Sequence, residues 1–110
     1  MEPIQGDKLR GHLEAMILST LDRGEAHGLE VLRRLEEAGC GLLRLKEGSL
    51  YPALCRLEAQ SWIKGAWGVS DANRKARYYS LTAAGRKHFQ AETARWETLS
   101  STINLMLKAT

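Results

Sequence analysis

The 110 residues, 44% hydrophobic and 26% charged, accommodate one ordered domain with a modest core, and they exclude a second large domain and a disordered chain. The net charge of +3 permits nucleic-acid binding without requiring it, because acidic residues are almost as numerous as basic ones. No apolar run approaches the roughly 18 residues that span a bilayer and no secretion signal is recognisable, so we expect a cytoplasmic protein with no membrane partner.

Two amphipathic helices are predicted in the first third of the chain. The first covers residues 9–21, with five apolar residues at steps of three and four: Leu9, Leu13, Met16, Ile17 and Leu21. The second runs from about Ala26 to Ala38, and Gly39 supplies its stop. Its expected inward residues are Leu29, Val31, Leu32 and Leu35. Residues 40–45 alternate weakly and are expected to add a short strand to a later hairpin.

A third helix is predicted from Glu47 to Gln60, and its start has two alternatives. If Ser49 is the N-cap, Pro52 lies in the first turn, where its missing N–H is harmless. If the helix opens at Glu47, Pro52 forfeits a helical hydrogen bond. Cys55, on this helix, is expected in the core.

A β-hairpin is predicted after this helix, with strands over residues 63–69 and 76–81. The polar stretch between them contains Asp71 and Asn73, which are suited to turning the chain. Arg74, Lys75 and Arg77 then place three cations within four residues. A helix that presents small and hydroxyl residues beside a basic hairpin is the arrangement of a winged helix. A solvated charge run is the alternative explanation of the cations.

The aromatic residues of the hairpin region have packing roles in the simplest interpretation. Tyr78 and Tyr79 point to opposite faces of a strand, so one is expected to pack beneath the wing and the other to face solvent or DNA. Trp62 and Trp67 are expected to pack in the core or against the wing.

Thr82 is predicted to cap a long helix that ends near Lys108, with Gly85 weakening its first turn. An a/d-like apolar stripe follows it: Phe89, Trp96, Leu99, Ile103 and Met106. Packing against the chain's own first helix is one explanation, but about 25 residues of helix extend well beyond so small a core. We therefore expect a two-fold homodimer, with Leu9 and Leu13 completing the interface.

The expected domain organisation is a DNA-binding winged helix-turn-helix over residues 1–81 and a dimerisation helix over 82–110, together one structural unit. In the dimer, two Trp96 indoles could face one another and sandwich a flat aromatic or other small hydrophobic effector. Simple interface packing is the alternative that the usual composition of interfaces favours.

No catalytic, cofactor or metal site is predicted, so we do not expect an enzyme. His12, His27 and His88 lack metal-binding spacing, and no glycine-rich segment matches a phosphate or dinucleotide loop. Cys40 and Cys55 stand too far apart for a Cys-x-x-Cys site and are expected to be reduced thiols. His27, at a helix start, is expected to be structural, with capping or a phosphate contact as alternatives.

The predicted DNA contacts come from the third helix and the wing. Ser49 and Tyr51 would contact phosphates or base edges, and Arg56 would reach guanine or the backbone. The alternative is that Ser49 only caps the helix and Tyr51 is a half-buried aromatic. The wing cations would act as point charges on phosphates, with an affinity that falls as salt rises. The complete predicted set is Lys46, Ser49, Leu50, Tyr51, Arg56, Arg74, Lys75 and Arg77.

Three motifs carry a family resemblance when taken together. They are His27-Gly28-Leu29-Glu30, Gly48-Ser49-Leu50-Tyr51-Pro52-Ala53-Leu54 with Arg56-Leu57-Glu58, and Arg77-Tyr78-Tyr79 with Leu81-Thr82 and Gly85. In combination they resemble the PadR family of bacterial transcriptional regulators, in its short form with one C-terminal dimerisation helix. Two departures are Leu29, where many relatives carry Tyr, and Ser61-Trp62-Ile63 in place of Gly-Leu-Ile; a glycine at residue 61 would adopt positive φ more easily.

The resemblance implies a dimeric winged-helix repressor that binds an inverted-repeat operator in double-stranded DNA and is often released by a small molecule. Since some relatives hold planar aromatic compounds at the dimer interface, it also suggests Trp96 as an effector contact. We thus expect a mainly α fold with a two-stranded β wing. The alternative function is a winged-helix protein-interaction module that does not bind DNA.

Overall fold

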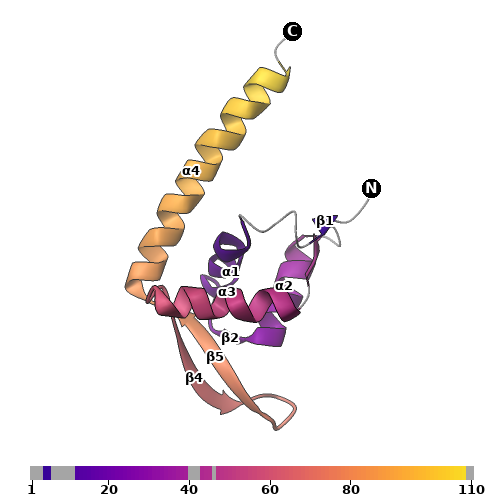
Figure 1. Ribbon diagram of the computed structural model, residues 1–110, viewed down its shortest axis with the longest axis vertical. Coiled ribbons are helices and arrows are strands. Elements are labelled where there is room, and N and C mark those ends of the chain that lie inside the picture. The colour runs from indigo at the N-terminus through magenta and orange to yellow at the C-terminus, as the bar shows by residue number, and fades with distance from the viewer. Residues whose placement is uncertain (1–3, 6–11, 40–42, 46, 109–110) are drawn as a thin grey trace.

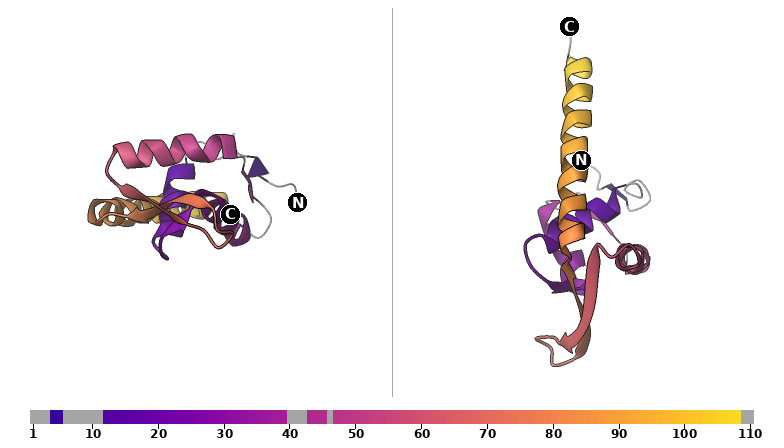
Figure 2. Two further views of the ribbon diagram at one scale, coloured as in Figure 1. Left: turned by 90° about the horizontal axis from the view of Figure 1, so that it is seen from below. Right: turned by 90° about the vertical axis from the view of Figure 1, so that its left-hand side faces the viewer.

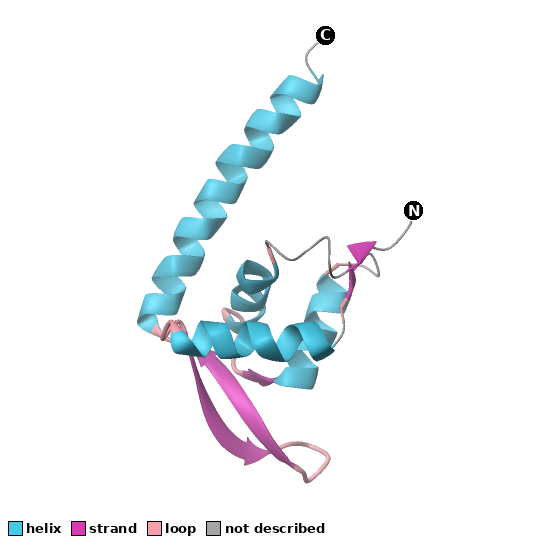
Figure 3. Cartoon of the chain, in the orientation of Figure 1, coloured by secondary structure: helices cyan, strands magenta, loops and turns pink. Residues whose placement is uncertain are grey.

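The computed structural model describes residues 4–5, 12–39, 43–45 and 47–108. In chain order the elements are β1 (Ile4–Gln5), α1 (Leu13–Leu21), β2 (Ala26–His27), α2 (Gly28–Ala38), β3 (Leu43–Arg44), α3 (Glu47–Ala59), β4 (Ile63–Val69), β5 (Lys75–Leu81) and α4 (Ala83–Lys108). The hairpin β4–β5, here called the wing, and the long α4 leave the group of short helices in opposite directions (Figures 1 and 2). This arrangement confirms the mainly helical winged-helix fold, coloured by element type in Figure 3.

The core lies between α1, α2 and α3 and is closed on one side by the base of the wing. Its largest fully buried side chains are Ile17, Leu18, Val31, Leu50, Leu54, Leu57 and Ile63. Leu29 is an exception to the predicted core, because its side chain is 50% exposed. Helical geometry explains the error: at 100° per residue, residue 29 points almost opposite to the buried Val31.

The wing forms as predicted, with β4 and β5 antiparallel and in register from Ile63↔Leu81 to Val69↔Lys75. The sheet also contains a third strand, because β2 pairs with β5 on its other side. Ala26, expected at the start of the second helix, belongs instead to β2, since two residues are too few to show an alternating pattern. The strand expected within 40–45 exists as β3, but it pairs in parallel with β1 and not with the hairpin.

The two ends of α3 decide between the predicted starts and explain where the helix stops. The helix opens at Glu47, so Pro52 lies inside it and Ser49 is not its N-cap. At the other end Ser61 has a φ of 61°. Its N–H donates to the Glu58 carbonyl at 2.9 Å, and the Trp62 N–H donates to the Leu57 carbonyl at 3.1 Å. This is a Schellman stop in which serine occupies the left-handed position that glycine fills most easily.

The junction between α3 and α4 is held by Thr82, which caps α4 as predicted. Its Oγ1 accepts the Gly85 N–H at 2.9 Å and donates to the Ser61 carbonyl at 2.6 Å. A Cβ on Gly85 would lie 1.8 Å from the Trp62 carbonyl oxygen. Gly85 therefore lets the first turn of α4 pack closely against the turn that follows α3, which explains a glycine at this position.

The first turns of α4 pack on the chain's own core. Phe89, predicted in the dimer interface, is partly buried against that core. It therefore packs within its own chain, which was the alternative explanation of the apolar stripe. Leu13, assigned to the dimer interface, is 5% exposed; that assignment is wrong for its side chain, because the core of the same chain already covers it. Leu9 lies outside the described residues. Among those described, no helix is both long and apolar enough to cross a membrane.

Candidate nucleic-acid interface

The solvent-facing side of α3 is made largely of small residues. Gly48, Pro52, Cys55 and Ala59 are all exposed, and their spacing of three and four residues places them in one row along the helix. By the same geometry Ser49 and Arg56 flank this row on one side, and Tyr51 and Glu58 flank it on the other. Such a face allows another surface to approach the helix backbone closely.

The burial pattern of α3 corrects two predictions. Leu50, assigned to the DNA-contacting set, is 1% exposed and belongs to the core. Cys55, expected in the core, is an exposed free thiol. Both errors arise because α3 is apolar or small on both sides, so its composition alone does not tell which side faces the core.

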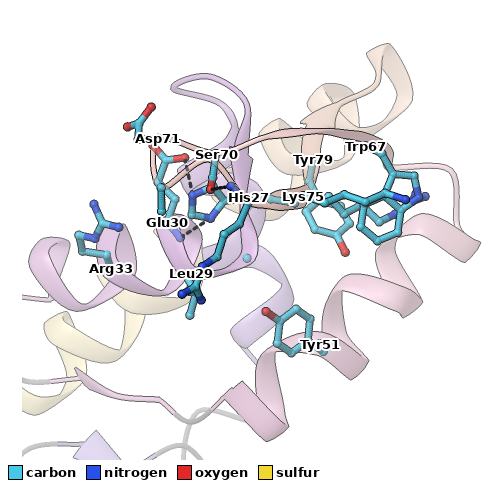
Figure 4. A pocket seen from close by; sticks show the side chains of 15 residues that line it. His27, Leu29, Glu30, Arg33, Tyr51, Trp67, Ser70, Asp71, Lys75 and Tyr79 are labelled. Atoms are coloured by element: carbon cyan, nitrogen blue, oxygen red, sulfur yellow. Dashed lines mark hydrogen bonds and ion pairs between the residues drawn. The ribbon is translucent and has the colours of Figure 1, made fainter.

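Tyr51 projects from α3 towards the N-terminus of α2 and the wing (Figure 4). Its side chain is 43% exposed. A Cβ placed on Gly28 would lie 3.0 Å from the Tyr51 hydroxyl oxygen, so the glycine at the start of α2 makes room for the ring. His27 caps α2 by accepting the Glu30 N–H on Nδ1 at 3.2 Å, which confirms capping among the alternatives for this histidine.

Among the contacts predicted in and beside α3, Arg56 already has a carboxylate partner, and Lys46 is not described by the structure. The Arg56 Nε lies 2.6 Å from the Glu14 carboxylate of α1, so its guanidinium is held beside α1. Lys46 lies outside the described residues. Ser49 is exposed near the start of the helix, where its hydroxyl is accessible from solvent.

The three cations of the wing have different surroundings. Arg77 binds both oxygens of Glu58 on α3, with Nε–O and Nη2–O distances of 3.3 and 2.8 Å. These hydrogen bonds raise the pKa of Arg77 above its usual value. The Lys75 Nζ lies 4.9 Å from the centre of the Trp67 ring. In the part of the chain that the structure describes, Arg74 and Lys75 have no carboxylate partner.

Trp67 is the feature of this surface that sequence analysis missed. Its side chain is 62% exposed, so packing in the core is wrong; the ring contacts Lys75 and Arg77 of the wing and is otherwise largely open to solvent. The register places it directly opposite Arg77, on the wing face that Arg77 links to α3. The sequence contained a signal for this position. Side chains alternate between the two faces of each strand, and in a hairpin this places Trp67 on the same face as the cationic residues 75 and 77.

Tyr78 and Tyr79 occupy opposite faces of β5, as their alternation predicted. Tyr79 is buried, and burial raises the pKa of its phenol. Tyr78 lies on the other face, where its hydroxyl donates to the Val69 carbonyl at 3.2 Å and its ring meets the edge of His27 at 5.4 Å. Trp62 is partly buried against the core, in agreement with its expected role.

A groove of about 670 Å³ separates the start of α2 and Tyr51 from the wing, and Figure 4 shows the side chains on its walls. Its basic lining residues are Arg33, Arg74, Lys75 and Arg77, and its acidic ones are Glu30 and Asp71. Glu30 is engaged by Arg34 at 3.4 Å. The groove is therefore positively charged and suited to a polyanion.

Residues 17–91 match the family described as the Transcriptional regulator PadR-like family. This chain belongs to the PadR-like family. A transcriptional regulator from Clostridium thermocellum shares its fold with a TM-score of 0.83 and 31% identity, over 96% of this chain and 99% of the other. A PadR-like transcriptional regulator from Bacillus cereus gives a TM-score of 0.82 and 30% identity, over 96% and 100%.

An uncharacterized protein from Lysinibacillus sphaericus is 25% identical to this chain over 105 residues, which is 96% of each sequence. The full-length agreement with PadR-like regulators includes α4 and the wing. The residues that carry the PadR resemblance have visible structural roles here: Gly28 accommodates Tyr51, Glu58 pairs with Arg77, and Gly85 accommodates the Trp62 carbonyl.

The distal half of α4 in this PadR-family chain presents apolar side chains to solvent. The large exposed ones are Trp96, Leu99, Ile103, Leu105, Met106 and Leu107. The Trp96 ring meets the His12 ring in an edge-type contact, with centroids 5.3 Å apart, and 53% of its side chain is exposed. Contiguous apolar exposure of this kind marks an interaction surface.

Proposed function

We propose that this PadR-family regulator is a dimeric repressor that binds an inverted-repeat operator in double-stranded DNA. The observation that supports this most is the exposed, small-residue face of α3 beside a positively charged groove. α3 would enter the major groove and the wing would lie along the adjacent backbone and minor groove. Two-fold symmetry would set the two α3 helices about one turn of DNA apart.

The predicted contacts divide into two roles in this proposal. Ser49 and Tyr51, on the exposed side of α3, would meet base edges or phosphates, and Lys46 just before the helix remains a predicted contact. Arg74 and Lys75, which have no carboxylate partner in the described residues, would bind phosphates. Arg56 and Arg77 are already held by carboxylates, so they would contribute less.

The dimer would form through the distal half of α4, with residues 1–81 as the DNA-binding part and 82–110 as the dimerisation helix. Trp96, Leu99, Ile103 and Met106 are exposed at helical spacing, and a second copy would cover them. Across the two-fold axis the two Trp96 indoles would offer a place for a small aromatic effector.

A gel-shift titration of charge variants tests DNA binding. The double variant Arg74→Glu/Lys75→Glu should bind every sequence more weakly and show a flatter dependence on salt, because phosphate contacts are lost. Tyr51→Ala should mainly reduce the preference for operator over other DNA. The control Arg23→Glu/Lys87→Glu changes net charge equally at exposed positions away from the wing.

If both the wing variant and Tyr51→Ala bind operator as the wild type does, the assigned contacts are wrong. If the wild type binds no genomic fragment at low salt and a partner protein is captured instead, the chain is a winged-helix interaction module and the proposed function fails.

A further inference from the structure

We propose that Trp67 is a DNA contact of the wing: its indole packs on the deoxyribose of the strand that passes between α3 and the wing, while Arg74 and Lys75 bind the phosphates on either side. This inference rests on the proposed function, since it assumes that α3 occupies the major groove. It adds an apolar contact to a surface otherwise described by charge.

The exposure of Trp67 is the first observation. An indole in the middle of a strand normally packs against a neighbour, yet 62% of this side chain is exposed. Two cations of β5 lie beside it: the Lys75 Nζ is 4.9 Å and the Arg77 Cζ 5.7 Å from the ring centre. Cations at these distances interact favourably with an indole ring and orient it without covering it.

Arg77 fixes the position of the indole relative to α3. The guanidinium binds Glu58 of α3 through two hydrogen bonds and lies over Gly65, where a Cβ would come within 2.5 Å of its Nε. Gly65 therefore provides the space that the Arg77 side chain occupies. Arg77 therefore links the Trp67 face of the wing to α3 through Glu58.

The shape of duplex DNA indicates which group would occupy the groove beside Trp67. The major and minor grooves are separated by a sugar–phosphate backbone, so a protein with α3 in one groove and its wing in the next must straddle that backbone. The groove of about 670 Å³ lies between the wing and the start of α2, and Tyr51 of α3 also lines it. Its apolar lining includes Leu29, Tyr51 and Trp67, beside the cations. Its charges match phosphates, and its apolar surface matches the carbon atoms of the sugar.

The first experiment measures binding of the full-length protein to random-sequence duplex DNA across about 50 to 200 mM salt. Trp67→Ala should bind about tenfold more weakly at every salt concentration, with an unchanged slope, because it removes an apolar contact and no phosphate contact. Lys75→Gln should instead reduce the slope by about one unit.

Val69→Ala is the matched control. Val69 is 67% exposed two residues further along the same strand, but it does not line the groove. It should bind DNA as the wild type does. All three variants change exposed side chains, so their melting temperatures should stay within a few degrees of the wild type.

A second readout follows the indole itself. The difference in emission between the wild type and Trp67→Phe isolates Trp67 from the other two tryptophans. Adding duplex DNA should protect this emission from acrylamide, because the indole becomes covered. If the wild type binds DNA but Trp67→Ala binds equally well and the emission stays accessible, Trp67 is no contact and the proposed function stands.

Three further outcomes would overturn the inference in different ways. Weaker binding that appears together with a lower melting temperature, both restored by Trp67→Phe, would mean that the ring only shapes the wing. A wild type that binds no duplex at low salt would refute the proposed function and this contact with it. A captured acidic protein that protects Trp67 in place of DNA would assign the groove to that partner.

Discussion

The winged helix and the distal half of α4 use apolar residues at the same helical spacing with opposite results. In α1 and α3 these residues are buried by other segments of the same chain, as Ile17 and Leu54 show. In α4 beyond Trp96 they are exposed, as Ile103 and Met106 show. The spacing of apolar residues therefore indicates which side of a helix will be buried. It does not indicate whether the same chain or a second molecule covers that side.

The boundary between the two regions lies within α4. Its first turns are tied to the core by the Thr82 cap, by an Arg86–Asp22 ion pair at 2.5 Å and by stacking of His88 on Trp62 with ring centres 3.5 Å apart. After Trp96 the large apolar residues of the helix are exposed. A single helix in water gains little stability by itself, so this part is expected to need a second copy.

The largest expected effects compare one truncation in each region. Leu54→Ala should lower the free energy of unfolding by about 3 kcal/mol at every protein concentration, because it leaves a cavity in the core. Ile103→Ala should lower the melting temperature by an amount that depends on protein concentration, because it weakens association. Thermal unfolding at two concentrations, with light scattering for mass, checks both.

A monomeric mass at micromolar concentration, with a melting temperature of Ile103→Ala that does not depend on concentration, would contradict a dimer built on α4.

The junction between the regions is tested at Gly85. Gly85→Ala should cost about 2 kcal/mol of stability, because the new Cβ overlaps the Trp62 carbonyl and the backbone must move. Gly48→Ala is the control, since a Cβ there meets nothing within 4 Å, and it should leave stability unchanged or slightly higher. Equal melting temperatures for both variants would show that Gly85 does not pack closely against the Trp62 carbonyl.

A smaller effect is expected at Ser61, in the turn between α3 and the wing. Ser61→Gly should raise stability by about 1 kcal/mol, because glycine adopts the φ of 61° without the strain of a side chain. Ser49→Gly, in the exposed first part of α3, should lower stability by a few tenths of a kcal/mol. Urea unfolding of the two variants measures both signs, and a loss of stability in Ser61→Gly would contradict the turn geometry.

The smallest effect concerns Tyr79 at alkaline pH. Burial raises the pKa of its phenol above the usual value of 10.0, so the folded chain holds this proton more tightly than the unfolded chain does. The protonated phenol of Tyr79 therefore contributes to the stability of the fold. This contribution is complete below about pH 10 and is lost as the pH rises towards the pKa of Tyr79 in the folded chain. Tyr79→Phe should therefore show a shallower decline of melting temperature above pH 10, and identical declines would show that burial does not perturb this phenol.

Much of the fold could be predicted from the sequence because its signals are local. The spacing of Leu13, Ile17 and Leu21, the polar turn of the wing and the Thr82 cap each depend on residues a few positions apart. The motifs resembling PadR were also sufficient to predict the family. The candidate interface was predicted as a region, with α3 and the wing as its two parts.

What only the tertiary structure decided is the state of individual side chains in that interface. Arg56 is held by Glu14, 42 positions away, and Arg77 by Glu58, 19 positions away, so two predicted phosphate contacts already have carboxylate partners. Leu50, predicted to contact DNA, is buried, whereas Cys55 and Trp67, predicted to pack, are exposed. The sequence by itself determined the helices, the wing and the family, since local spacing and capping govern them; charge pairing and burial depend on distant segments and were decided only when these packed together.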